Sequence, residues 1–288
     1  MRRKALILAL SLGILPLMAW GQESSATLPA TTQQDMYCSG VVTTNHVSRS
    51  TEILSGEESL YDITFAQGDY VYINEGSKKG VKPGDEFSVM RPMSNETGVW
   101  WFAAQPRLLG AMGQMWEDEG RVKVVVAHPD VSIAQVTHSC SYMQRGDVLR
   151  PFVELPAPQL KSEANFDRFA PPSGKKKAMI VAGKAFEIQS GTNDIVYVNL
   201  GSKQGVNVGD YFRIFRYQSN DGDMVYQTPN MGTAVYGFGA APDDFSWKKL
   251  PREILGEGVV LRTTPNSSTV LITYSLRQIY EGDYCELE

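Results

Sequence analysis

Apolar and polar residues alternate most clearly in the segment 69–89. Val71 and Ile73 alternate with more polar neighbours before a glycine-rich stretch, and Phe87 and Val89 do so after it. A period of two is typical of a half-buried β-strand, because successive side chains point to opposite faces of the sheet. The segment therefore predicts a strand, a tight loop and a second strand.

This segment occurs twice in the chain. Residues 69–89 return at 194–214, and 12 of the 21 aligned positions are identical. Later matches, such as Gly120 with Gly256, lie at an offset of 136 rather than 125, so the second copy holds eleven extra residues between its halves. A repeat of this length indicates two supersecondary units, each of roughly 110 residues. Short strands separated by Gly and Pro turns predict an all-β protein with two tandem homologous small β-barrel or β-sandwich domains.

Glycine and aspartate recur at fixed positions in both copies. Glycine adopts positive φ without a steric cost, and aspartate accepts hydrogen bonds from turn amides, so these residues predict specific turns. We expect positive φ at the third glycine of each loop. The predicted turn residues are Gly76, Gly80, Gly84, Asp85, Gly146 and Asp147 in the first copy, and Gly201, Gly205, Gly209, Asp210, Gly282 and Asp283 in the second.

The composition along the chain divides it into five segments. Residues 1–21 have a basic start, an apolar run and small residues before position 22, which is typical of a Sec-type signal peptide cleaved after Gly21. We expect a disordered spacer at 22–35, a first β-domain at 36–152, a Pro-rich linker at 153–176 and a second β-domain at 177–288. The signal peptide, with no transmembrane candidate in the mature chain, predicts a periplasmic or secreted protein.

Three cysteines bear on the predicted compartment. Cys38 is placed on the first strand of the first domain, and Cys140 lies just before its closing turn. Barrel closure brings first and last strands together, so a disulfide between these two residues is predicted for an exported protein. Three buried reduced cysteines, with Cys285 as the third, are the alternative.

Charge and motifs argue against several functions. The 27 basic and 32 acidic residues give a net charge of −5, and without residues 1–21, which hold three basic residues, it becomes −8. Nucleic-acid binding, which needs a basic face, is not expected. The three histidines have no carboxylate at a telling spacing, and no motif indicates a catalytic residue, a metal or another cofactor. The acidic run 117–119 is interpreted as a solvated hairpin end.

Between the halves of each copy lies an insertion rich in aromatic residues. The candidate partner-binding residues are Trp100, Trp101 and Phe102 in the first insertion and Trp247 in the second. Large aromatic residues on loops that vary while the scaffold repeats are candidates for binding, because Trp and Tyr dominate interface hot spots. The alternative is that they fold back and cap their own barrel.

The string V-Y-I-N-x-G-S-x-x-G-V-x-x-G-D-x-F-x-V with a closing Gly-Asp turn resembles the C-terminal β-domain of flagellar assembly protein T and related envelope proteins. The matching residues are Val71–Val89 with Gly146 and Asp147, and Val196–Ile214 with Gly282 and Asp283. The resemblance implies a non-enzymatic assembly role in the periplasm, near the outer membrane or the cell wall. We therefore expect an exported binding or scaffold protein whose partners are envelope proteins or a cell-wall component. The alternative is a hydrolase acting on the cell wall or a polysaccharide through an unrecognised carboxylate pair.

Overall fold

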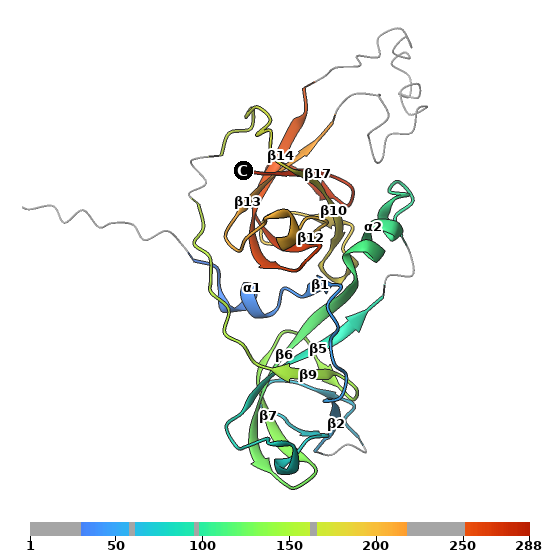
Figure 1. The fold of residues 1–288 in the computed structure, drawn as a ribbon, viewed down its shortest axis with the longest axis vertical. Helices are drawn as coiled ribbons and strands as arrows, with labels where there is room; N and C mark the ends of the chain where they lie inside the picture. The colour runs from blue at the N-terminus through green and yellow to red at the C-terminus, as the bar shows by residue number, and fades with distance from the viewer. Residues whose placement is uncertain (1–29, 58–60, 95–97, 162–165, 218–250) are drawn as a thin grey trace, which may run out of the picture.

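The computed structural model describes residues 30–57, 61–94, 98–161, 166–217 and 251–288, so the predicted signal peptide and Trp247 lie outside the described residues. Strands predominate, as expected of an all-β protein, and they form two units. We call them the N-terminal sheet, within 41–151, and the C-terminal barrel, within 177–287. Figure 1 shows the two units end to end, with α1 (Gln33–Tyr37) and β1 (Val41–Thr43) between them.

The N-terminal sheet is built from antiparallel strands in the order β2-β4-β7-β6-β5-β9, with β1 joined to β6. A single bridge between Glu52 and Val148 links its two ends. The short strands β3 and β8 form a separate pair. The bounds are β2 Ile53–Gly56, β3 Thr64–Phe65, β4 Tyr70–Ile73, β5 Glu86–Met93, β6 Gln114–Ala127, β7 Ser132–Ser139, β8 Met143–Gln144 and β9 Val148–Pro151.

The C-terminal barrel is closed, in the order β10-β12-β15-β14-β13-β17, and β11 pairs with β16 beside it. Matched by chain position, these strands follow one another in the same order as those of the N-terminal sheet. The bounds are β10 Lys177–Gly183, β11 Gln189–Ser190, β12 Ile195–Val198, β13 Tyr211–Arg216, β14 Glu253–Thr263, β15 Ser268–Ser275, β16 Ile279–Tyr280 and β17 Tyr284–Leu287.

The predicted alternation produces the interior of both units. Val71, Ile73, Phe87 and Val89 are buried together inside the N-terminal sheet. The residues at the corresponding positions, Val196, Val198, Phe212 and Ile214, lie in the core of the barrel. Burying apolar surface contributes about 25 cal/mol per Å², so these inward-facing positions stabilise each unit.

The loops that connect β4 to β5 and β12 to β13 contain the predicted turns. Each includes a short 3-10 helix, η1 (Ser77–Lys79) or η4 (Ser202–Gln204). Gly84 and Gly209 have φ values of 96° and 89°, which confirms the expected positive φ. Gly76 is extended, but a Cβ there would lie 2.2 Å from the carbonyl oxygen of His128, so the loop requires glycine for close approach.

The closing turns are each held by an arginine. Asp147 is buried, and both of its carboxylate oxygens accept hydrogen bonds from Arg91. Asp283 forms the same two bonds with Arg216 in the barrel. Burial raises the pKa of Asp283 to about 6, although Arg216 opposes this shift. Each aspartate thus fixes its turn by accepting a hydrogen bond from the amide of Gln144 or Tyr280, and each also pairs with a half-buried arginine.

The N-terminal segment departs from the sequence prediction. Helix α1 begins at Gln33, inside the predicted spacer, and Thr32 and Asp35 form a capping box at its start. Cys38 is at the C-terminal end of this helix rather than on a strand. The 22–35 boundary and the strand placement of Cys38 are therefore wrong, because a capped helical turn satisfies the backbone there.

The helices α1 and α2 (Gln105–Met112) and strand β1 join the two units. Their residues Met36, Val42 and Met112, together with Met115 of β6, share one hydrophobic cluster with the barrel. The barrel residues in this cluster are Val181, Ala182, Ile195, Tyr197, Tyr211, Val259, Leu261 and Leu271. Tyr197 also donates a hydrogen bond to the carbonyl oxygen of Ser39, at 2.9 Å. The described part of the linker 153–176 forms no helix or named strand.

No helix within the described ranges is long and apolar enough to cross a membrane.

Candidate functional site

The aromatic insertion of the N-terminal sheet presents one large exposed side chain. Trp100 is 75% exposed, whereas Phe102 is only 2% exposed. Trp101 is half-buried, and its ring meets that of Trp100 edge to face with 5.7 Å between the centroids. The prediction that Phe102 contacts a partner is therefore wrong, because its side chain is buried.

The insertion is attached to the C-terminal barrel. Trp101 donates a hydrogen bond from Nε1 to the carbonyl oxygen of Glu281, at 3.2 Å. Its ring also meets Tyr280 edge to face, with 6.4 Å between the centroids. The insertion thus covers the neighbouring barrel, which neither sequence interpretation anticipated.

A buried glutamine strengthens this attachment. Gln105, at the start of α2, donates to Oε2 of Glu281 at 2.7 Å and to the carbonyl oxygen of Val181 at 2.8 Å. Its own side-chain oxygen accepts a hydrogen bond from the amide of Val99. Burial raises the pKa of Glu281, although its bonds with Gln105 and the amide of Gly183 oppose this. Trp100 consequently projects from a segment that is fixed on both sides.

The acidic run 117–119 is not a solvated hairpin end. It lies within β6, where Asp118 and Glu119 are buried. Asp118 accepts a hydrogen bond from the amide of Gly40 and pairs with Arg262 of the barrel at 2.9 Å. Glu119 is 3.1 Å from Arg91, and burial raises its pKa to about 7. Leu255 is the barrel residue that corresponds to Glu119, and it lies in the barrel core. This match is the signal in the sequence that indicates an inward-facing position for Glu119.

A cavity of about 330 Å³ lies between the N-terminal sheet, the start of the linker and the barrel. Its charged and titratable lining residues include Arg121, Arg150, Arg262, His138 and Asp118. Glycoside hydrolysis uses two carboxyl groups about 5–10 Å apart across one cleft. Asp118 is the single carboxylate among the described residues that line this cavity, and it is engaged by Arg262. The cavity therefore gives no support to the hydrolase alternative.

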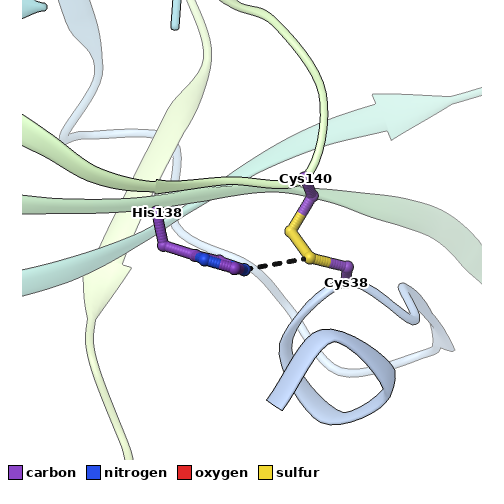
Figure 2. A group of neighbouring side chains, drawn as sticks. All are labelled: Cys38, His138 and Cys140. Atoms are coloured by element: carbon purple, nitrogen blue, oxygen red, sulfur yellow. Dashed lines mark hydrogen bonds between the residues drawn. A yellow bond between two sulfur atoms is a disulfide. The ribbon is translucent and has the colours of Figure 1, made fainter. Parts of the chain in front are cut away.

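The predicted pair Cys38 and Cys140 forms a disulfide, with 5.3 Å between the Cα atoms. Figure 2 shows the ring of His138 beside it, with Nε2 3.3 Å from Sγ of Cys38. The three side chains have the spacing of metal ligands, but the sulfurs in a disulfide are not thiolates and do not supply that chemistry. Cys285 is a free cysteine buried in the barrel core, where burial raises its pKa.

A scan against models of known protein families finds no match, and a search of curated protein sequences finds no significant match.

Proposed function

We propose that this protein is an exported, non-enzymatic binding or scaffold protein of the bacterial cell envelope, and that a partner contacts it through Trp100. The observation that carries the proposal is the 75% exposure of Trp100 on a segment that Trp101 and Gln105 hydrogen-bond to the C-terminal barrel. A large aromatic side chain presented in a fixed position contributes contact area at low entropic cost. Trp101 packs edge to face against Trp100 and is a positioning residue.

Two further observations support the location. The disulfide of Cys38 with Cys140 is the kind of bond that persists in oxidising compartments such as the periplasm or the cell exterior. The strand–turn–strand motif in both units is similar to that of the flagellar assembly protein T domain.

We also propose that the two units are tandem copies of one ancestral domain, because their strand order and interior positions correspond. The partner would be an envelope protein or a cell-wall component.

The test places a photoreactive amino acid at position 100 of the full chain in native cells. The same amino acid at Phe169, which is 82% exposed in the linker, is the matched control. We expect a discrete crosslinked species in the envelope fraction from position 100 and none from position 169. Crosslinking of the purified protein to isolated cell-wall sacculi distinguishes a cell-wall component from a protein partner.

The variant Trp100→Ala provides the second measurement. Because the side chain is exposed, its removal should leave the Tm nearly unchanged while capture of the crosslinked partner falls. A lowered Tm with unchanged capture would show that Trp100 has a structural role and would contradict the proposal. Equal crosslinking from positions 100 and 169 would do the same.

A further inference from the structure

We propose that the Cys38–Cys140 disulfide is a thiol–disulfide exchange site that reacts with small thiols such as glutathione. The incoming thiolate attacks the sulfur of Cys140, and the sulfur of Cys38 leaves as a thiolate stabilised by His138. The first support is access, because Cys38 is only 2% exposed whereas Cys140 is half-buried. Exchange takes place at the sulfur that a thiol reaches.

The polar groups around the two sulfurs also favour Cys38 as the leaving sulfur. Nε2 of His138 lies 3.3 Å from Sγ of Cys38, where an N–H donor stabilises the negative charge of a departing thiolate. Sγ of Cys140 lies 3.3 Å from the carbonyl oxygen of Tyr37, which would accept a hydrogen bond from a thiol and disfavour a thiolate. Lower basicity of the leaving sulfur speeds its departure, so cleavage with Cys38 leaving is favoured.

Two hollows, one lined by His138 and one by Cys38, contain other charged groups. The cavity that His138 lines also contains the positively charged Arg121, Arg150 and Arg262. A second hollow, which Cys38 itself lines, also contains Asp35, Lys184, Glu187 and Asp194. The carboxylate of Asp35 is occupied by bonds from Thr32, and that of Asp194 accepts a bond from the amide of Gly191. His138 is in direct contact with Sγ of Cys38, at 3.3 Å, and Coulomb energy falls with distance.

The exchange balances in two steps. A glutathione thiolate forms a new S–S bond with Cys140 while the Cys140–Cys38 bond breaks, and Cys38 receives the electron pair. A second glutathione thiolate then attacks the glutathione sulfur of this mixed disulfide, which releases oxidised glutathione and the thiolate of Cys140. Solvent supplies the protons that the released thiolates of Cys38 and Cys140 take up. The net reaction oxidises two glutathione molecules and reduces one protein disulfide.

The first test measures the equilibrium of the full chain with glutathione redox buffers, with acid quenching, thiol alkylation and peptide mass mapping. We expect His138→Ala to shift the equilibrium toward the disulfide by about tenfold, the change produced by about 1.4 kcal/mol. His138→Gln retains an N–H donor and should restore part of the shift. The matched control His128→Ala removes an exposed histidine from the β6–β7 turn and should leave the equilibrium unchanged.

The second test identifies the attacked sulfur. Wild-type protein quenched during reduction should carry glutathione on Cys140 and not on Cys38. A mixed disulfide on Cys38 would overturn the assigned direction. Equal redox equilibria for wild type, His138→Ala and His138→Gln would overturn the role of His138, and circular dichroism of each variant verifies that it is folded.

Discussion

Replacing Glu119 tests whether the buried charge in the N-terminal sheet destabilises it. The side chain is 1% exposed, and the contact with Arg91 is close but not aligned for a hydrogen bond. Leu255 takes the corresponding position in the barrel, so an uncharged side chain suits this site. In Glu119→Gln or Glu119→Leu, Arg91 would keep its two bonds to Asp147, as Arg216 does with Asp283.

The magnitude follows from the pKa. Burial raises the pKa of Glu119 from 4.5 to about 7 in the folded protein. Below pH 4.5 both states are largely protonated, and the ionisation of this residue does not contribute to the free energy of unfolding. As the pH rises from 4.5 to 7, the unfolded state ionises first, so wild type loses stability at up to about 1.36 kcal/mol per pH unit. The loss totals about 3 kcal/mol and stays constant at higher pH.

The assay is urea denaturation of wild type and both variants at pH 4.5 and pH 8, followed by circular dichroism. The free energy of unfolding of Glu119→Gln minus that of wild type should be about 3 kcal/mol larger at pH 8 than at pH 4.5. Glu57→Gln replaces an exposed glutamate and is the control for a general pH effect. The same stability difference between Glu119→Gln and wild type at both pH values would refute the argument, because no charged-state penalty would then exist.

Three other changes probe the remaining features. Replacing Cys38 and Cys140 by Ser should lower the free energy of unfolding in urea by roughly 4–5 kcal/mol, since the bond closes a loop of 102 residues. Gly84→Ala should cost about 1 kcal/mol in the same assay, because a side chain is forced to a φ of 96° although the space is open. Gln105→Ala should lower the stability by about 1–3 kcal/mol in thermal denaturation, because it leaves buried oxygens, including Oε2 of Glu281, without this donor.

Short-range patterns were sufficient to predict the strands and turns. The inward residues Val71 and Phe87 alternate with polar neighbours, and the glycines that need positive φ recur in both loops. The sequence alone predicts a solvated hairpin end at 117–119, because three consecutive acidic residues are usually solvated. The partners of this acidic run, Arg91 and Arg262, are distant in sequence, so only the folded chain shows that the charges are paired.

The disulfide shows that a correct prediction can rest on a wrong premise. The sequence predicts that Cys38 lies on a strand that closes a barrel, but this residue ends α1 and is bonded to Cys140, just after β7. The helix itself is five residues long, too short to produce a recognisable apolar period. The docking of Trp101 against the barrel likewise depends on contacts almost two hundred residues apart, for which the local sequence carries no signal.

The outer faces of the two units explain why α1, β1 and α2 pack against the barrel. Interior positions correspond closely, but the barrel is apolar outside at positions where the N-terminal sheet is polar. The pairs that differ most are Tyr211 against Glu86, Val259 against Lys123, and Leu271 against Gln135. These barrel residues belong to the cluster covered by α1, β1 and α2, whereas Lys123 is exposed. Because a contiguous apolar face is costly in water, this face of the barrel is suited to the cover that α1, β1 and α2 provide. The two units therefore pack together through one shared hydrophobic cluster.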